Sequence, residues 1–204
     1  MTQSTVAVVR TGTANLASVA VALRRRGVEH RFADSPRDIL DAPALVLPGV
    51  GAFKAAMDEL DARGFSAALR ERVAAGAPTL AICLGLQLFA RSSEESPGAE
   101  GLGAVPGAVR RLEGDVRIPQ LGWNLVEPDP GCGLVEAGHA YYANSYALRE
   151  RPDGWSAAWT THGVRFVAAL ERGPVLACQF HPELSGPWGA ALLARWLAQA
   201  GVAC

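Results

Sequence analysis

The sequence lacks the features of a membrane-spanning or nucleic-acid-binding chain. No apolar run approaches the roughly 20 residues that cross a bilayer. Its 19 Lys and Arg residues do not outnumber its 20 Asp and Glu residues, and they form no basic stripe. The first residues also lack the basic stretch that opens a secretory signal. We therefore predict a cytoplasmic protein that binds neither membranes nor nucleic acids.

Cysteine is also scarce, and its spacing does not suggest a metal site. No C-x-x-C pair occurs, and no histidine lies at metal-ligand spacing from a cysteine. The cysteines are Cys83, Cys132, Cys178 and Cys204. We therefore predict reduced thiols, no metal site and no cofactor. The open question is whether one of these thiols is a nucleophile.

The first half of the chain alternates apolar runs with helical periodicity. Short apolar runs typical of buried parallel strands occupy residues 5–9, 44–47 and 79–82. Residues 15–26 and 65–75 carry apolar side chains at helical spacing, and a glycine follows each segment. This alternation predicts an α/β fold with a mostly parallel central sheet and helices on both faces.

The second half is richer in β-structure. Its expected strands cover residues 109–112, 141–148, 156–161, 166–170 and 175–180. Residues 91–107 read as a surface loop, and residues 188–199 as a terminal amphipathic helix. The chain is long enough for one sizeable core, and no linker or internal repeat divides it. We therefore predict a single domain over residues 1–204, with extra antiparallel strands in its second half.

Cys83 stands where a buried strand turns into a helix, within the segment 78–87 (PTLAICLGLQ). A side chain at so sharp a turn projects above the sheet, as in a nucleophile elbow. A helix N-terminus favours the thiolate form of cysteine, and the N–H of Leu84 is placed to donate to an oxyanion. The small residues Ala81 and Gly85 relieve crowding at the turn. A buried structural cysteine is the alternative, since short strings of this kind also occur by chance.

His181 is the best candidate for the base that a thiol nucleophile needs. It follows the apolar run 175–180, so it also emerges at the end of a strand, and Glu183 comes two residues later. A carboxylate on one ring nitrogen would set the tautomer and stabilise the imidazolium. Because ligands of open α/β sheets bind at the carboxyl ends of strands, we predict a Cys83–His181–Glu183 triad. A solvent-facing His-Pro-Glu turn is the alternative.

Three segments together resemble the class I (triad) glutamine amidotransferases. Residues 78–87 resemble the nucleophile motif of this family, residues 179–183 (QFHPE) its His–Glu motif, and residues 47–53 (LPGVGAF) its oxyanion strand. The order and spacing fit along the whole chain. The resemblance implies a flavodoxin-like class I glutaminase domain. It also implies that Cys83 forms a thioester with glutamine while His181 transfers the protons.

Within this family, the chain most resembles the glutaminase subunits of imidazole glycerol phosphate synthases, which act in histidine biosynthesis. The similarity rests on residues 12–19 (GTANLASV), 48–53 and 118–124 (IPQLGWN), and on the absence of a fused synthetase segment. It implies a heterodimer with a (β/α)8-barrel cyclase subunit. The glutaminase would pass ammonia to that subunit, which makes imidazole glycerol phosphate and AICAR from PRFAR.

The resemblance also implies roles for further residues. Backbone N–H groups of Leu84 and of Val50 or Gly51 would hold the oxyanion. The residues implied to bind glutamine are Gln87, Glu95, Ser145 and Tyr146. The residues implied to face the partner are Pro119, Gln120, Trp123 and Asn124.

Two of these roles have alternatives that the sequence leaves open. Glu95 could hold the α-ammonium group of the substrate, or it could form a solvated loop pair with Glu94. Trp123 could be an interface anchor or an ordinary core aromatic.

The chain departs from the family pattern at three positions. Ala81 stands where glycine is usual, Asn144 where histidine is common, and Leu184 where lysine is common. That lysine contributes to the family's interface, so we expect the coupling to the partner to differ here. None of the three departures touches the triad.

Other functions stay open at this stage. The chain could be the glutaminase of pyridoxal phosphate, anthranilate, GMP or aminodeoxychorismate synthesis, although the tryptophan–asparagine motif argues against these. It could be a flavodoxin-like nucleotide-binding module. However, Lys54 stands where G-x-G-x-x-G requires glycine, and no Walker A string occurs. A non-catalytic scaffold is disfavoured by the intact Cys–His–Glu set.

Overall fold

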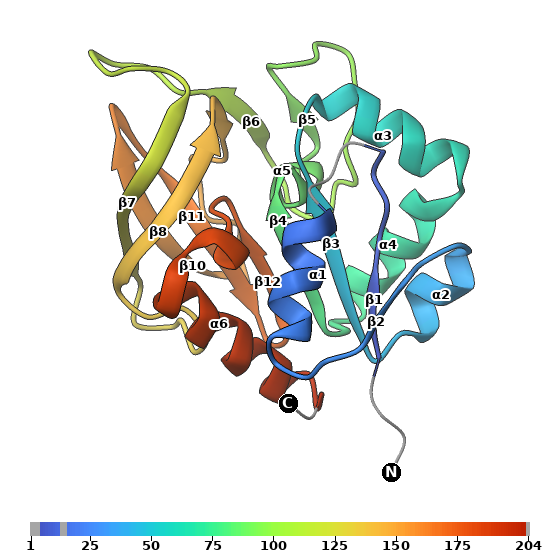
Figure 1. Ribbon diagram of the computed structural model, residues 1–204. Coiled ribbons are helices and arrows are strands. Elements are labelled where there is room, and N and C mark those ends of the chain that lie inside the picture. The colour runs from blue at the N-terminus through green and yellow to red at the C-terminus, as the bar shows by residue number, and fades with distance from the viewer. Residues whose placement is uncertain (1–4, 13–15, 203–204) are drawn as a thin grey trace.

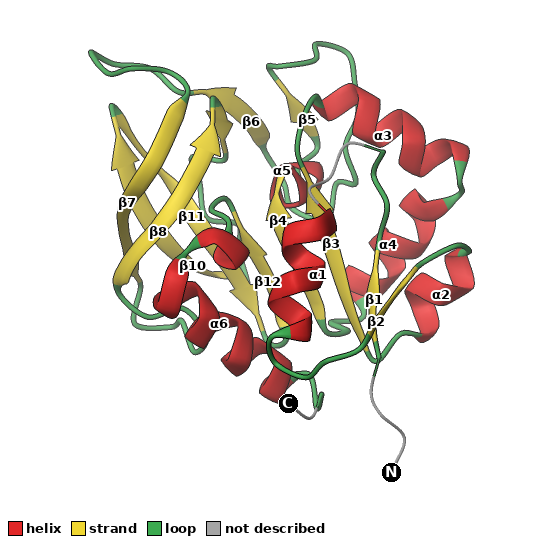
Figure 2. Ribbon diagram, viewed as in Figure 1, coloured by secondary structure: helices red, strands yellow, loops and turns green. Residues whose placement is uncertain are grey.

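The apolar runs of the first half form the parallel part of a nine-stranded sheet. In the computed structural model, which describes residues 5–12 and 16–202, the strand order is β2-β1-β3-β4-β12-β11-β10-β7-β8 (Figures 1 and 2). The parallel strands are β1 (Val6–Val8), β2 (His30–Phe32), β3 (Ala44–Gly49), β4 (Thr79–Cys83) and β12 (Val175–Cys178). All of these except β2 are buried at every residue, which explains their nearly continuous apolar character.

The antiparallel part of the sheet comes from the second half of the chain. Beyond β12 lie β11 (Val164–Arg172), β10 (Ser156–His162), β7 (Gln120–Pro128) and β8 (Gly138–Asn144). A small three-stranded sheet consists of β5 (Ser92–Ser93), β6 (Ala108–Arg111) and β9 (Tyr146–Ala147). The large sheet is therefore mixed, with the change from parallel to antiparallel pairing at β12.

Helices cover both faces of the parallel strands. They are α1 (Leu16–Arg24), α2 (Pro36–Asp41), α3 (Phe53–Ala62), α4 (Phe65–Ala74), α5 (Leu84–Leu88), the 3₁₀ turn η1 (Pro182–Leu184) and α6 (Gly186–Gln199). Figure 1 shows α1 in front of β3 and β4. Val46 packs with residues of α1 and α6 on one face, while Leu45 and Leu47 pack with α2, α3 and α4 on the other. Within the described residues, no helix has the length and apolar character needed to cross a membrane.

The predicted α/β fold, parallel in its first half and antiparallel in its second, is confirmed. The sequence analysis missed β2, α2, α3 and β7, and also the short β5 inside the segment 91–107 that it predicted to be a loop. For α2 a signal was present, because Ser35 and Asp38 form a reciprocal capping box and Pro36 is the first helical residue. The residues 13–15 and Cys204, which entered the sequence argument, lie outside the described residues.

Three adjacent parallel strands end at the same edge of the sheet. Gly49 closes β3, Cys83 closes β4, and His181 comes shortly after the end of β12. Gly49 is paired in register with Cys83, and Cys178 with Ile82. The predicted oxyanion segment, nucleophile and base therefore leave the sheet side by side.

Candidate active site

Cys83 occupies a strained turn between β4 and α5. Its φ of 54° and ψ of −108° make it the only described residue other than glycine with a positive φ. Such backbone conformations cluster at functional sites, because the surrounding structure must hold them in place. Cys83 is only 5% exposed, and it lines a cavity. Its side chain is therefore accessible from the cavity but not freely solvated. These features match the elbow that the sequence predicts.

The glycines beside this turn allow α5 to approach β3 closely. A Cβ on Gly85 would lie 2.1 Å from the carbonyl oxygen of Leu47. A Cβ on Gly49 would lie 2.8 Å from the Cβ of Leu84. The sequence analysis expected Gly85 to relieve crowding at the turn. The structure shows why a glycine is needed at position 85, since a side chain there would meet the Leu47 carbonyl. The positive φ at the turn belongs to Cys83 and not to Gly85.

His181 is braced by Glu183 inside the protein. Its Nδ1 lies 2.8 Å from Glu183 Oε1, and the two side chains are only 6% and 3% exposed. The backbone N–H of His181 donates to the Tyr141 carbonyl at 2.9 Å, and Ser185 Oγ donates to the His181 carbonyl at 2.6 Å. The solvent-facing His-Pro-Glu turn is therefore not what the chain forms.

The charges around His181 favour its protonated form. Burial by itself would lower the pKa of His181, but hydrogen bonds to Cys83 and Glu183, with their negative charge, raise it to about 10. The His181–Glu183 pair thus lies at the same cavity as the Cys83 thiol. The imidazolium is the form that stabilises a neighbouring thiolate.

The cysteine opens onto a cavity of about 260 Å³. Cavities that hold drug-sized ligands usually measure about 300–1,000 Å³, so this one suits a small molecule such as a single amino acid. Its lining residues include Val50, Gly51, Cys83, Leu84, Gln87, Glu95, Pro119, Asn144, Ser145, Tyr146 and His181. Apart from Glu183, which stands behind His181, every residue predicted for catalysis, the oxyanion or glutamine binding meets in this cavity.

Two of the predicted substrate residues are held by specific hydrogen bonds. Gln87 Nε2 donates to the Tyr146 carbonyl at 2.9 Å. Glu95 Oε2 accepts from the N–H of Phe53 at 2.7 Å, which caps the first turn of α3. Glu94 instead accepts from the N–H of Arg111. The two acids therefore have separate partners and do not form a solvated loop pair.

The residues predicted to donate to the oxyanion line the same cavity as Cys83. Leu84 is the first residue of α5, so its N–H has no partner within the helix. Val50 and Gly51 follow β3 and line the same cavity, and Gly51 has a φ of 94°. A glycine there lets the backbone take this conformation without strain.

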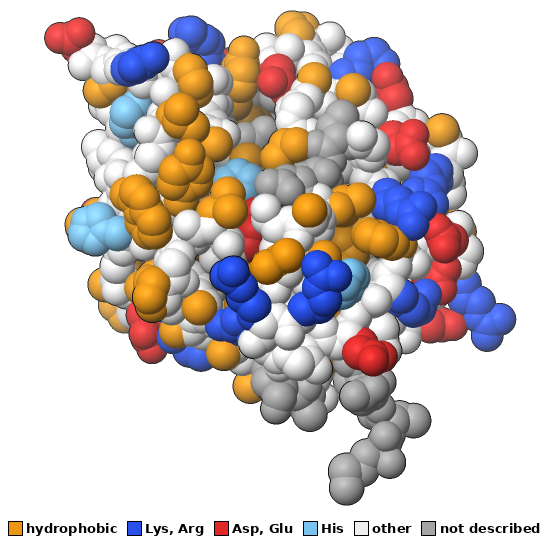
Figure 3. Space-filling model, viewed as in Figure 1, with side chains coloured by type: hydrophobic (Ala, Val, Ile, Leu, Met, Phe, Trp, Pro, Cys, Tyr) orange, Lys and Arg blue, Asp and Glu red, His pale blue; other side chains and the backbone are white. Residues whose placement is uncertain are grey.

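Strand β7 presents an apolar face to solvent. Leu121, Trp123 and Leu125 alternate along it and are 70%, 57% and 40% exposed. Figure 3 shows hydrophobic side chains gathered over β7 and β8. Trp123 contacts the ring of Tyr141 edge-on, with centroids 6.2 Å apart. It is therefore not the core aromatic that the sequence left as an alternative.

The other residues predicted to face a partner lie differently. Pro119 lines the Cys83 cavity. Asn124 is half-buried and donates to the Thr161 carbonyl at 2.8 Å. The predicted role of Gln120 at the partner face stays a prediction, although its side chain is buried in the single chain. Its side chain is only 4% exposed, because it starts β7 pointing inward.

The sequence analysis missed one polar residue at the sulfur. Gln179 is fully buried, and its Nε2 lies 3.7 Å from Cys83 Sγ. It had been read only as part of a motif at the end of a strand. Asn144, noted as a departure from the family pattern, lines the cavity and donates to the Tyr146 carbonyl at 3.1 Å.

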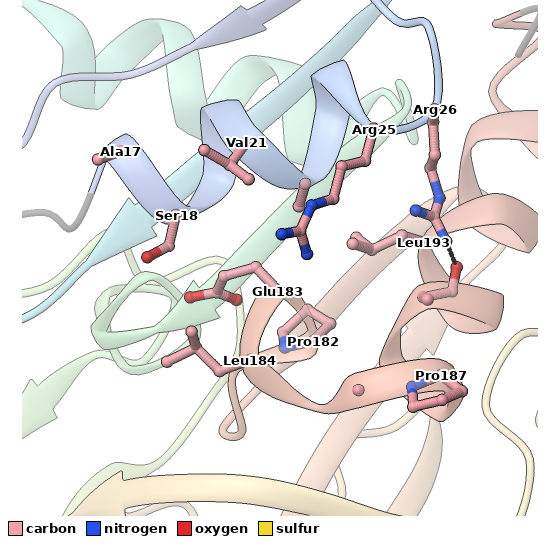
Figure 4. A pocket seen from close by; sticks show the side chains of 13 residues that line it. Ala17, Ser18, Val21, Arg25, Arg26, Pro182, Glu183, Leu184, Pro187 and Leu193 are labelled. Carbon is pink, nitrogen blue, oxygen red and sulfur yellow. Dashed lines mark hydrogen bonds between the residues drawn. The ribbon is translucent and has the colours of Figure 1, made fainter.

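A larger cavity, of about 620 Å³, lies behind Glu183 between α1 and α6 (Figure 4). Arg25 and Glu183 both reach into it, with apolar walls from Leu184 and Leu193. Neither a cysteine nor a histidine is among its described lining residues, so the smaller cavity beside Cys83 is the candidate active site. Among the described residues, no group of three His, Cys, Asp or Glu side chains is arranged to hold a metal ion.

Comparisons with known proteins agree with this geometry. The family described as glutamine amidotransferase class-I matches residues 8–200. Two similar proteins are the imidazole glycerol phosphate synthase subunits HisH of Symbiobacterium thermophilum and Mycolicibacterium paratuberculosis. The first is 42% identical over 94% of this chain and 92% of its own length. The second is 42% identical over 97% and 98%. A crystal structure of a glutamine amidotransferase, 22% identical, superposes with a TM-score of 0.76 over 96% of this chain and 99% of its own.

Proposed function

Because the chain belongs to the class I glutamine amidotransferases, and within them to the HisH subunits of imidazole glycerol phosphate synthase, we propose that it hydrolyses glutamine for histidine biosynthesis. The products are glutamate and ammonia, and the ammonia goes to a cyclase partner. The observation that carries the proposal is that Cys83 and the Glu183-braced His181 meet at the wall of one cavity of amino-acid size.

The first half of the reaction forms a thioester. The Cys83 thiolate attacks the side-chain carbonyl carbon of glutamine, and the carbonyl oxygen becomes an oxyanion. The N–H of Leu84, with that of Val50 or Gly51, stabilises this charge. When the tetrahedral intermediate collapses, the C–N bond breaks and the His181 imidazolium gives its proton to the leaving nitrogen. Ammonia departs, and a γ-glutamyl thioester remains on Cys83.

The second half hydrolyses the thioester. His181, now neutral, takes a proton from water as the water oxygen attacks the thioester carbonyl. A second oxyanion forms at the same N–H groups and collapses with cleavage of the C–S bond. Glutamate leaves, and the thiolate and the imidazolium are restored. Glu183 keeps Nδ1 engaged throughout, so Nε2 is the atom that exchanges protons.

The cavity offers matching groups for the ends of the substrate. The Glu95 carboxylate suits the α-ammonium group of glutamine, and Gln87, Ser145 and Tyr146 border the remaining space. Val50 and Gly51 border the same cavity as Cys83, which favours a role of this segment at the oxyanion over the nucleotide-binding alternative. Because glutamine offers a carboxylate, an ammonium and an amide, several such polar contacts are needed for selectivity.

The proposed partner is a (β/α)8-barrel cyclase subunit, joined to this chain as a heterodimer. In water, ammonia is mostly protonated and lost by diffusion, so a glutaminase of this kind requires a covered path to an acceptor. The cyclase would use the ammonia to make imidazole glycerol phosphate and AICAR from PRFAR. The exposed face of Leu121, Trp123 and Leu125 on β7 supports docking here. Pro119 connects this strand directly to the cavity.

Glutamine hydrolysis by the full chain tests the catalytic proposal. Glutamate release should fall by more than about a thousandfold in Cys83→Ala, because the covalent route is lost. Cys132→Ala is the matched control. Burial and the neighbouring Glu171 raise the pKa of Cys132 to about 12, so this thiol is unreactive and its loss should leave turnover unchanged. Normal turnover in Cys83→Ala would refute the assignment.

Association with the cyclase tests the partner proposal. Trp123→Ala should raise the Kd by roughly thirtyfold, as expected for an aromatic at the centre of an interface. Leu40→Ala is the control. Leu40 is also exposed (38%), but it lies on α2, which packs on the face of the parallel strands away from α1 and α6. Adding the cyclase with its phosphoribosyl substrate should also raise glutamine turnover. Equal Kd values for both variants would place the docking surface elsewhere.

A further inference from the structure

The sulfur of Cys83 has a neighbour that the reaction steps above do not use. Gln179 is 0% exposed although its side chain is polar. Its Nε2 lies 3.7 Å from Cys83 Sγ, a distance typical of a hydrogen bond to sulfur. A buried amide is costly unless its polar atoms are paired. The position of this donor against the sulfur is therefore set by specific contacts.

The orientation of the Gln179 amide is fixed by its second neighbour. Gln87 Nε2 donates to the backbone carbonyl of Tyr146 at 2.9 Å and to Gln179 Oε1 at 3.1 Å. A backbone carbonyl can only accept, so the nitrogen of Gln87 must face it. The oxygen of Gln179 must then face that nitrogen. This leaves the NH₂ group of Gln179 directed at Cys83.

We infer that Gln179 is a positioning residue that donates a hydrogen bond to the Cys83 thiolate, and that Gln87 locks it in the donating orientation. The inference rests on the proposed function in taking Cys83 as the nucleophile. Hydrogen bonds to ionised acceptors are stronger than those to neutral ones, so this donor stabilises the thiolate more than the thiol. Gln87 therefore serves both as a wall of the cavity and as the support of a buried donor.

Other charged groups also act on this sulfur, and they must stay constant in a test. His181 borders the same cavity, and Glu183 is hydrogen-bonded to its imidazole. Glu95 and Tyr146 border the same cavity. None of these side chains is altered in the variants below, so their contribution is common to all of them.

Alkylation of the full chain by iodoacetamide tests the inference, because it reports on the thiolate without requiring glutamine. In Gln179→Met, which keeps the length of the side chain but removes the donor, labelling of Cys83 at about pH 7 should slow about tenfold. The difference in rate between the two proteins should disappear at about pH 10, where cysteine thiols in general are ionised. Peptide mass analysis separates Cys83 from the other thiols.

Two control variants separate the donor from general packing effects. Gln87→Met removes the lock but leaves the donor, so it should slow labelling less than Gln179→Met does. Thr160→Val changes another fully buried polar residue, on β10, and should have no effect.

An unchanged labelling rate in Gln179→Met at about pH 7 would overturn the inference. A deficit that persists at about pH 10 would also overturn it, since that result indicates altered access to the sulfur. Glutamine hydrolysis is measured on the same samples. If the unsubstituted chain fails to hydrolyse glutamine with its partner present, the proposed function fails, while the labelling comparison still decides the role of Gln179.

Discussion

The strained turn at Cys83 leads to a prediction about stability that is independent of turnover. Cys83→Gly should be more stable than Cys83→Ala, although alanine is normally the better residue. The backbone at this position has a φ of 54° and a ψ of −108°, a conformation that residues with a Cβ avoid. Holding such a residue costs about 1–3 kcal/mol, and alanine retains that cost while glycine does not.

The expected difference follows from two opposing terms. Replacement by glycine relieves the backbone strain, which stabilises the folded state. It also costs about 0.5–1 kcal/mol, because glycine gives the unfolded chain more conformational freedom. The net advantage of glycine is therefore about 1 kcal/mol. In a chain of this length, that corresponds to a Tm about 2–4 °C higher for Cys83→Gly, which differential scanning calorimetry resolves.

A neighbouring position provides the control. Ala81 is fully buried within β4 and has no positive φ. Ala81→Gly should lower the Tm, because glycine inside a strand costs about 0.5–1 kcal/mol and removes a buried methyl. If Cys83→Ala melts at the same temperature as Cys83→Gly or higher, the turn is not strained. The elbow geometry would then be wrong.

Three further predictions concern the surroundings of the site. Gly85→Ala should lower the free energy of unfolding by more than about 2 kcal/mol, measured in urea, since its Cβ would meet the Leu47 carbonyl oxygen at 2.1 Å. The pKa of His181 is raised to about 10, so the stability that its protonation contributes is complete below about pH 6.5 and is lost as pH rises through about 10. The stability difference between the unsubstituted chain and His181→Asn, measured across this pH range, should therefore shrink as pH rises. Arg72→Met should cost about 2–4 kcal/mol, because the buried guanidinium donates to two backbone carbonyls at 2.7 Å, whereas Arg24→Met on the exposed face of α1 should be nearly neutral.

The parallel strands other than β2 could be predicted, because burial on both faces leaves an unmistakable apolar run. Strand β7 could not be predicted in this way, because its apolar side chains are exposed while a polar one is buried. Leu121, Trp123 and Leu125 point to solvent, while Gln120 at its start points inward. Alternation along a strand identifies two faces but does not say which one is covered. Under the proposed docking, the apolar face of β7 would be covered by a partner, which the sequence of a single chain does not reveal.

The residues of the site also differ in how far they could be predicted. Some are identified by their neighbours in the sequence, and others only by contacts with distant residues. Cys83 and His181 were predictable because each follows an apolar strand, and Glu183 because it lies next to His181 in sequence. Gln179 was not, because its role depends on Gln87, 92 residues away. Polar side chains inside an apolar run carry no sign of the partner that satisfies them. Their function becomes visible only when the hydrogen bonds are traced.

The position of β7 gives a physical reason why docking and catalysis should be coupled. Pro119 lines the wall of the cysteine cavity, and the next residue begins the strand that carries Trp123. A partner that covers the exposed face of β7 would therefore also press on the cavity and exclude water from its mouth. Excluding water lowers the local dielectric constant, which strengthens the attraction between the His181 imidazolium and the Cys83 thiolate. In the proposed assembly a partner would do more than collect ammonia, because its contact with β7 would also stabilise the charge pair proposed to start the reaction.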